Sequence, residues 1–191
     1  MDEVWIDLSP LPPEAGHLLV ATSVLGDPHF RRSVVYLLEH NADGTLGVVL
    51  NRPSGTDVAE VLPRWRDLVS GPAVLFEGGP VQPDGALCLG ALDVAPADAR
   101  PLHDGIVSVD LDGDPDSVVG TASALRVFAG YAGWSAGQLE AEIAEGAWWV
   151  VPGSREDLFS ADPVGLWSRV LRRQPPPLSY MSTYPDDPTR N

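Results

Sequence analysis

The segment SVVYLLEHNADGTLGVVL, residues 33–50, decides how this chain begins to fold. Two apolar, β-branched runs at residues 33–39 and 45–50 flank a turn that ends in Asp43 and Gly44. An Asp-Gly pair supplies the positive φ that a tight connection between antiparallel strands requires. Both runs carry apolar residues at successive as well as alternate positions, which is typical of strands buried on both faces. The segment therefore predicts a hairpin inside a central sheet.

Short apolar runs bounded by Gly, Pro and Asp continue outward from this hairpin in both directions. Runs of this length and composition are typical of strands. Further strands are expected at residues 17–23, 73–76, 86–92, 106–111, 126–131 and 148–151.

Helix starts can be located from capping patterns. Asp57 with Glu60, and Ser135 with Gln138, have the spacing of a capping box. Asp162, followed by proline at the first helical position, marks a third start. A short helix is also plausible at residues 117–123. Because strands and short helices mix irregularly instead of alternating strictly, the expected fold class is α+β.

The chain length of 191 residues fits one domain. Residues 1–16 contain several prolines and are expected to form an extended lead-in. Residues 17–173 are expected to form the single domain. The proline-rich tail, residues 174–191, is expected to lie extended along the domain or to be disordered.

The composition favours a cytoplasmic protein. The single Cys88 cannot form an internal disulfide, which suits a reducing compartment. The first residues are acidic where a secretory signal would be basic. Because no run of eighteen apolar residues occurs, no membrane span is expected.

The charge balance disfavours direct nucleic-acid binding. All 12 basic residues are arginine, and 27 acidic residues give a formal net charge of −15. Such a charge repels polyphosphates, and a nucleic-acid binder normally presents a basic stripe. The two small clusters, Arg31-Arg32 and Arg169-Arg172-Arg173, are interpreted as solvated or locally paired arginines.

Ser135 lies in Gly133-Trp134-Ser135-Ala136-Gly137, which has the Gly-x-Ser-x-Gly pattern of a nucleophile elbow. The pattern stands between an expected strand and an expected helix, as that motif requires. However, all four histidines precede Ser135, whereas the α/β-hydrolase order places the catalytic histidine after the serine. A helix cap explains Ser135 together with Gln138. A serine hydrolase is therefore kept as the alternative hypothesis.

Alternating aspartates at 110, 112, 114 and 116 invite a calcium interpretation. An EF-hand loop needs glycine at its sixth position and glutamate at its twelfth, but here glycine is fourth and Thr121 is twelfth. A solvated acidic turn is the better interpretation. We expect neither a metal site nor a cofactor.

The run Glu77-Gly78-Gly79-Pro80 predicts a specific backbone geometry. Paired glycines allow a tight turn or a close backbone approach, and they can expose N–H groups in a concave nest. An ordinary turn between two strands is the alternative. Joined to other polar and aromatic loop residues, this run would form a pocket for a small polar ligand or a partner protein. The predicted binding residues are Asn51, Arg52, Glu77, Gly78, Gly79, Pro80, Tyr131, Gly133, Trp134 and Gln138.

Four segments of the chain resemble, in order, the motifs of the YqgE/AlgH family of bacterial proteins. The similarity covers nearly the whole expected domain, so it is specific although each motif alone is weak. The four segments are residues 18–22 with 27–35, residues 47–53, residues 77–81, and residues 130–134 with 137–140 and Trp148.

The resemblance implies a compact α+β fold built around a strongly bent, barrel-like, mixed or antiparallel sheet flanked by short helices. It implies no established biochemical activity, and some members carry a transcriptional-regulator label. Two features depart from the family pattern: the tail extends beyond Arg173, and Ser135 occupies a slot not reserved for serine. The leading hypothesis is a non-catalytic binding or regulatory protein.

Overall fold

The computed structural model describes residues 11–94, 96–97 and 99–185 of the chain. The predicted lead-in therefore lies largely outside the described residues. The strands are β1 (His17–Ala21), β2 (Val34–Asn41), β3 (Gly44–Val49), β4 (Pro53–Asp57), β5 (Val74–Glu77), β6 (Val81–Leu92), β7 (Arg100–His103), β8 (Ile106–Val109), β9 (Ala122–Ser135) and β10 (Trp148–Pro152). The helices are α1 (Val58–Val61), α2 (Gln138–Ala144), α3 (Arg155–Leu158), α4 (Leu166–Arg172) and the 3₁₀ helices η1 (Pro115–Ser117) and η2 (Leu178–Thr183).

These strands form one strongly curled, ten-stranded sheet within the described residues. The main order is β10-β1-β2-β3-β9-β6-β8-β7, and β4 is attached through β5 to β9. The β5–β9 pair is parallel, and the remaining pairs along this path are antiparallel. The fold class predicted from the sequence, α+β with a bent, barrel-like mixed sheet, is confirmed.

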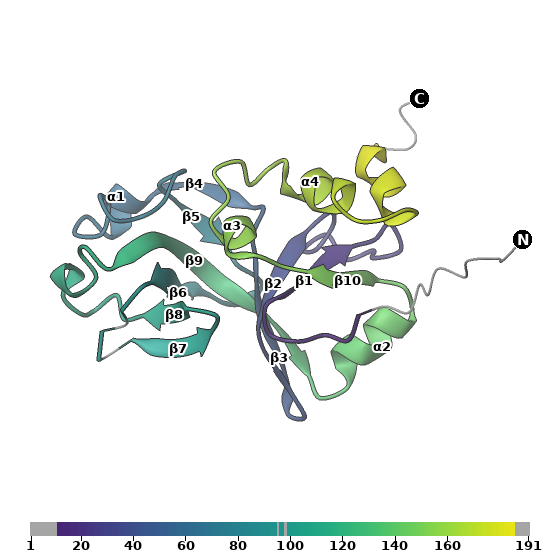
Figure 1. Cartoon of the computed structure of the whole chain (residues 1–191), viewed down its shortest axis with the longest axis horizontal. Helices are drawn as coiled ribbons and strands as arrows, with labels where there is room; N and C mark the ends of the chain where they lie inside the picture. The colour runs from purple at the N-terminus through teal and green to yellow at the C-terminus, as the bar shows by residue number, and fades with distance from the viewer. Residues whose placement is uncertain (1–10, 95, 98, 186–191) are drawn as a thin grey trace, which may run out of the picture.

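Strand β9 joins the two halves of the sheet (Figure 1). Its last residues pair with β3, from Gly44 opposite Ser135 to Gly47 opposite Ala132. Its earlier residues pair with β6, as far as Val81 opposite Tyr131. The change of partner occurs beside Gly130, whose φ of +70° is one that side-chain-bearing residues rarely adopt. The bend of the sheet is therefore located in β9.

The two glycines after β5 let the backbone pass directly over this bend. A Cβ at Gly78 would overlap the carbonyl oxygen of Gly130, and one at Gly79 would overlap the backbone of Tyr131. Gly79 also has a φ of +152°. The glycine pair is thus required for a close crossing of two backbone segments.

Both faces of the β1–β2–β3 region are buried, as the apolar pattern predicted. Alternate residues of β1 point to opposite sides: Leu18 and Val20 join a core with α4, whereas Leu19 and Ala21 join a core with α2. Figure 1 shows α4 above and α2 below the β1–β10 pair. The hairpin predicted at residues 33–50 is confirmed as β2 and β3.

A third core lies under α1 in the other half of the sheet and contains Trp65, Cys88 and Val127. Burial raises the pKa of the Cys88 thiol to about 12. Cys88 is a small, buried, apolar contact residue.

Arg126 of β9 is buried between this sheet and the segment after α3. Its side chain is 1% exposed. Its guanidinium donates to the carbonyl oxygens of Gly71, Leu158 and Ser160, each at 2.9 Å. Burial lowers its pKa to about 10. Since its described partners are carbonyl groups and the ring of Phe76, 4.2 Å away, Arg126 stabilises the fold by connecting separate segments.

Several predicted boundaries are wrong, for identifiable reasons. Strands β4 and β7 were missed because each contains proline, which is unfavourable in central strands but tolerated at the sheet edges that they occupy. The helix expected at 117–123 is instead the 3₁₀ turn η1 followed by the start of β9.

Two helices also begin later than predicted. Ser135 is the last residue of β9, and the N-cap of α2 is Gly137 with a φ of +76°. Gln138 still bonds backwards as predicted, because its Oε1 accepts from the Ser135 N–H at 3.0 Å. Helix α4 begins at Leu166, after a turn in which Asp162 Oδ1 accepts from the Gly165 N–H at 3.2 Å.

The first part of the proline-rich tail is folded, unlike the extended or disordered tail that was expected. Helix η2 packs against α4, and its Leu178 and Met181 contact the main core. The carbonyl oxygen of Tyr184 accepts a hydrogen bond from Arg32 at 2.8 Å.

Candidate functional site

Four of the predicted binding residues line one open cavity of about 550 Å³, called here the Arg52–Glu77 cavity. They are Arg52, Glu77, Gly79 and Pro80. The cavity lies where the segment after β3 and the segment after β5 run side by side, because the Glu77 N–H donates to the Arg52 carbonyl at 2.9 Å. The remaining lining residues are His29, Val49, Pro83 and Ala129.

Arg52 holds one wall of this cavity in place. Its guanidinium donates to the carbonyl oxygens of Arg31 at 3.0 Å and Pro28 at 3.4 Å. Burial lowers the pKa of Arg52, while the carboxylates of Glu77 and Asp27 act in the opposite direction. Because arginine side chains stay protonated in proteins, this guanidinium is charged at neutral pH, and it lies beside the exposed carboxylate of Glu77.

The cavity offers groups of both charges against small apolar surfaces. Glu77 is an exposed acceptor, Arg52 is a donor and His29 is an exposed imidazole. Two proline rings, Pro80 and Pro83, supply rigid apolar contacts. Such a combination suits a polar ligand or the backbone and side chains of a peptide segment.

His29 and Pro83 were not predicted as site residues. His29 lies in residues 27–35, which belong to the first of the four segments that resemble the family motifs. Its place in that segment, directly before Phe30 and Arg31, was the sequence feature from which it could have been found. Pro83 belongs to an irregular part of β6, where the pairing with β9 shifts between Val81 and Ala86. That irregularity depends on pairing across the sheet and leaves no local pattern.

Asn51 has a structural role that the sequence did not predict. Its Oδ1 accepts from the Val34 N–H at 2.9 Å, and its Nδ2 donates to the Arg32 carbonyl at 2.8 Å. Both ends of the amide are thus used to fix the start of β2. Asn51 positions the loop that carries His29 and Arg31.

Trp134 belongs to a different structural unit, called here the Glu142 clamp. Glu142 Oε2 accepts from the indole N–H groups of Trp134 at 2.9 Å and Trp148 at 2.8 Å. Glu142 Oε1 accepts from Gln138 Nε2 at 3.1 Å. Phe30 packs against both indoles, with ring centroids 5.6 to 6.0 Å apart. Glu142 therefore attaches α2 to β9 through Trp134 and to β10 through Trp148.

The predicted site is consequently divided. Tyr131 lines a separate cavity of about 310 Å³ with Arg100 and Glu39. Trp134 lines another of about 270 Å³ beside the β2–β3 turn. Gly133 is an exposed residue of β9, and Gly78 is buried at the backbone crossing. The predicted binding residues that line cavities are therefore distributed over three of them, with Arg52 and Glu77 in one and Trp134 in another.

Ser135 lacks the geometry of a nucleophile elbow. It ends β9 opposite Gly44, and its hydroxyl lies 3.2 Å from Gln138 Oε1. The ring of His40 serves other groups, with Nδ1 2.7 Å from Thr45 Oγ1 and Nε2 3.5 Å from Glu140. Nothing in these contacts supports the serine hydrolase alternative.

The acidic turn is held by its own carboxylates. Asp110 Oδ1 accepts from the Asp112 N–H at 3.0 Å, and Asp114 Oδ1 accepts from the Asp116 N–H at 3.2 Å. In the described part of the chain, no group of three or more His, Cys, Asp or Glu side chains could hold a metal ion.

The arginine cluster on α4 is largely paired. Arg173 binds both carboxylate oxygens of Asp157, at 2.7 and 2.6 Å, and Arg169 binds Asp162 at 2.7 Å. Hydrogen bonding to Asp157 raises the pKa of Arg173. The interpretation of these two as locally paired arginines is confirmed, whereas Arg172 is exposed.

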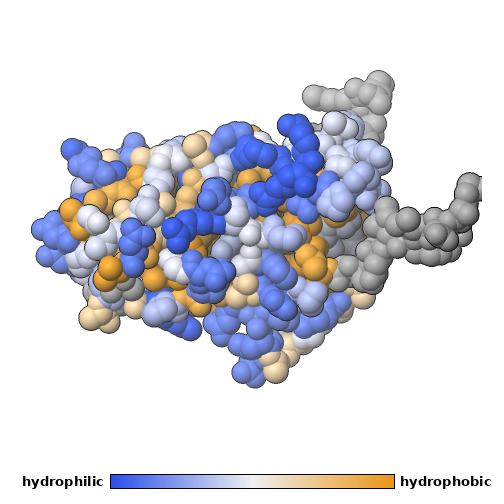
Figure 2. Space-filling view, in the orientation of Figure 1, coloured by the Kyte–Doolittle hydropathy of each residue, from blue (hydrophilic) through white to orange (hydrophobic). Residues whose placement is uncertain are grey.

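The outer surface carries no large apolar face in the view of Figure 2. Hydrophilic residues dominate, and apolar residues are exposed there in small separate patches. None of the helices in the described ranges has the length and apolar character needed to cross a membrane.

The fold and these cavities define an α+β protein whose bent, mixed sheet carries several open cavities. A family model described as DUF179, AlgH-like, matches residues 18–179. The chain belongs to this AlgH-like family, which confirms the resemblance seen in the sequence. The match also continues past residue 173, into η2.

Relatives of this chain are similar over nearly their whole lengths. A UPF0301 protein of Thermobifida fusca is 52% identical over 187 residues, covering 92% of this chain and 94% of the relative. A UPF0301 protein of Streptomyces avermitilis is 49% identical over 182 residues, with the same two coverages, 92% and 94%.

Solved structures agree with the fold. A crystal structure of a Corynebacterium diphtheriae protein has a TM-score of 0.85 at 35% identity, covering 93% of this chain and 95% of that chain. The solution structure of the AlgH protein from Pseudomonas aeruginosa has a TM-score of 0.67 at 31% identity, covering 90% and 94%. The names of these relatives describe a family without stating a reaction.

Proposed function

We propose that this protein is a non-catalytic binding protein that recognises a polar ligand or partner-protein segment through the Arg52–Glu77 cavity. The observation that carries the proposal is that Arg52, Glu77 and His29 converge on one open cavity of about 550 Å³. Charge-assisted hydrogen bonds to such groups are stronger than neutral ones and depend on geometry. The cavity therefore suits a partner that presents a donor to Glu77 and an acceptor to Arg52.

A regulatory role would follow from this binding and not from direct contact with nucleic acid. The formal net charge of −15 opposes the approach of a polyanion. Arg169 and Arg173, which could have formed a basic face, are engaged by Asp162 and Asp157. We place this function in the cytoplasm, a setting that suits a chain whose single cysteine is buried and unpaired.

The test is affinity capture from a lysate, with native mass spectrometry of the bound fraction to register small ligands. Wild-type protein is compared with Glu77→Gln and Arg52→Gln, and Arg64→Gln is the matched control. Arg64 is exposed, and its ion pair with Asp114, at 3.3 Å, lies outside the cavity.

The Glu77→Gln variant decides the test. The Glu77 side chain is exposed, so this variant should fold as the wild type does. We expect both cavity variants to lose the bound species at least about tenfold, as removal of a charge-assisted bond implies, and Arg64→Gln to keep it. Retention of the same species by Glu77→Gln would refute the proposal.

A further inference from the structure

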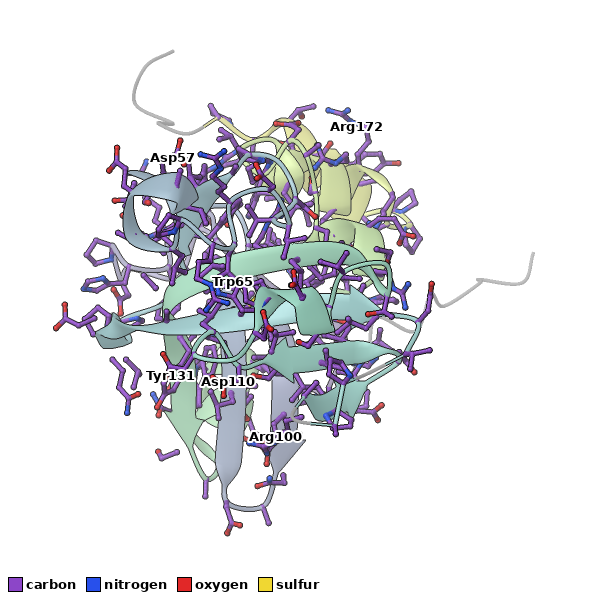
Figure 3. The ribbon with its side chains drawn as sticks, turned by 90° about the vertical axis from the view of Figure 1, so that its left-hand side faces the viewer. Asp57, Trp65, Arg100, Asp110, Tyr131 and Arg172 are labelled. Atoms are coloured by element: carbon purple, nitrogen blue, oxygen red, sulfur yellow. The ribbon has the colours of Figure 1, made fainter. Side chains whose placement is uncertain are left out.

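A second cavity, called here the interlobe cavity, lies between the two halves of the sheet and has a volume of about 310 Å³. Its walls come from β2, β3, β6, β7, β8 and β9. It is distinct from the Arg52–Glu77 cavity, since the two share none of their lining residues. In Figure 3, its lining residues Arg100 and Tyr131 both lie toward the end from which the β2–β3 hairpin projects.

Three separate strand irregularities converge on the interlobe cavity. The β2–β3 pairing shifts at Leu38, and the β7–β8 pairing shifts at Leu102. The β6–β9 pairing shifts over the segment that contains Gln82 and Gly85. All four of these residues line the cavity. Bulges redirect side chains and are frequent next to functional sites, so their convergence indicates a built site.

One of these irregularities includes an unfavourable backbone conformation. Gln82 has a φ of +48°, although it is not glycine. Residues other than glycine adopt this region rarely and at a cost in free energy, and such residues cluster at ligand sites. The backbone strain at Gln82 lies in the part of β6 where the pairing with β9 shifts. This strain is a second observation in favour of a site.

The lining combines an apolar interior with one pair of opposite charges. The apolar residues are Leu38, Leu46, Leu87, Leu102 and the ring of Tyr131. At the rim, Arg100 Nη2 of β7 lies 3.6 Å from Glu39 Oε2 of β2. Both side chains are substantially exposed, at 74% and 45%, so each can exchange its partner for a ligand group.

We propose that the interlobe cavity binds a free apolar α-amino acid of the size of leucine or phenylalanine. The side chain fills the leucine-lined interior, the ammonium group bonds to Glu39 and the carboxylate bonds to Arg100. The ligand thus separates the Glu39–Arg100 pair and satisfies both of its charges.

Size and charge select this class of ligand. A volume of about 310 Å³ is at the lower end of the range for small-molecule sites, roughly 300–1,000 Å³, which disfavours nucleotides and large cofactors. A fatty acid would leave Glu39 without a cationic partner, with only its hydrogen bond from Asn41 Nδ2 at 2.8 Å among the described residues. As an anion, it would also be repelled by the net charge of −15. A zwitterion carries no net charge and meets both rim groups.

The test is isothermal titration of the full chain with L-leucine and L-phenylalanine. Glycine, N-acetyl-leucine and leucinamide each lack one of the three recognised features and serve as matched ligands. We expect saturable binding of leucine or phenylalanine and at least about tenfold weaker binding of all three matched ligands.

Variants assign the binding to this cavity. Glu39→Gln and Arg100→Gln should each weaken binding at least about tenfold, because each removes one charge-assisted contact. Arg64→Gln, in an exposed ion pair elsewhere, should bind as the wild type does. Glu39 and Arg100 do not line the Arg52–Glu77 cavity, so failure of this proposal and failure of the Arg52–Glu77 proposal are distinguishable.

Three results would overturn the proposal. The first is the absence of saturable binding for both amino acids. The second is equal binding of leucine and N-acetyl-leucine, which would point to the carboxyl end of a peptide as the occupant. The third is unchanged leucine binding by Glu39→Gln and Arg100→Gln, which would place the ligand elsewhere.

Discussion

The Glu142 clamp and the Arg52–Glu77 cavity look alike in the sequence, because both combine glycines, aromatic or proline rings and charged groups. In the structure they differ in where their polar atoms point. Glu142 accepts from three side-chain donors within its own unit. The Glu77 carboxylate, by contrast, is exposed at an open cavity. One loop faces both units, with Phe30 packed on the indoles and His29 in the cavity wall.

This difference gives a criterion for separating structure from recognition. A charged group whose hydrogen-bonding capacity is filled inside the protein stabilises the fold and has little left for a ligand. A charged group that faces an open cavity contributes little to stability and remains available. The criterion predicts that loss of the Glu142 carboxylate lowers the free energy of unfolding, whereas loss of the exposed Glu77 carboxylate leaves it nearly unchanged.

Substitution of Gly79 by alanine should have the largest effect. The new Cβ would overlap the backbone of Tyr131, and the φ of +152° is unfavourable for alanine. Overpacking and backbone strain together should lower the free energy of unfolding by about 3 kcal/mol or more. Urea denaturation measures the change. Gly55→Ala is the control, since nothing lies within 4 Å of its Cβ position, and an equal loss in both variants would contradict the crossing as the cause.

Substitution of Glu142 by alanine should have the next largest effect. It leaves the indole N–H groups of Trp134 and Trp148 without their acceptor in a partly buried setting. The free energy of unfolding should fall by about 2–3 kcal/mol, while ligand capture through the Arg52–Glu77 cavity should persist at concentrations of folded protein equal to the wild type. Glu145→Ala, on an exposed residue of the same segment, is the control. A loss of stability smaller than that of Glu145→Ala would show that the Glu142 clamp does not stabilise the fold.

The alkaline pH dependence of stability tests whether water is excluded from Cys88, in the core under α1. Burial raises the pKa of Cys88 from 9.0 to about 12. The folded state therefore keeps the proton while the unfolded state loses it. This contribution to stability is fully present below pH 9 and is lost as the pH rises toward 12.

The stability difference between wild type and Cys88→Ala should accordingly shrink by roughly 1 kcal/mol between pH 8 and pH 10. Denaturant unfolding at both pH values measures it, and the comparison with the variant cancels the other groups that titrate in this range. A difference that stays constant with pH would show that water reaches the thiol.

The sequence predicted local features well where one segment carried the whole signal. The hairpin at residues 33–50 depends on its own apolar runs and its turn. It formed with Asn41 opposite Gly44, so Gly44 follows a two-residue loop. A Cβ at Gly44 would overlap the carbonyl of Trp134. This contact with β9 also requires glycine, and it could not be predicted from the hairpin sequence alone. Gln138 bonded to Ser135 as expected, yet the helix began two residues later because β9 extends through Ser135.

The composition of the Arg52–Glu77 cavity was less predictable, because it depends on how distant segments cross. Arg52 and Glu77 meet through a backbone bond between two strand ends. Tyr131 and Trp134 follow the bend of β9 at Gly130, and each lines a different cavity from Arg52 and Glu77. The three bulges around the interlobe cavity are likewise properties of strand pairing and cannot be read from one strand.

We propose that recognition takes place at the Arg52–Glu77 cavity and not at the Glu142 clamp. The most direct measurement is a two-dimensional ¹⁵N–¹H spectrum of the full chain, recorded before and after addition of a clarified lysate fraction. We predict that amide shifts concentrate at His29, Arg52, Glu77 and Gly79, with the indole N–H signals of Trp134 and Trp148 unchanged. Shifts centred on those indoles and on α2, with the cavity residues unaffected, would contradict the account.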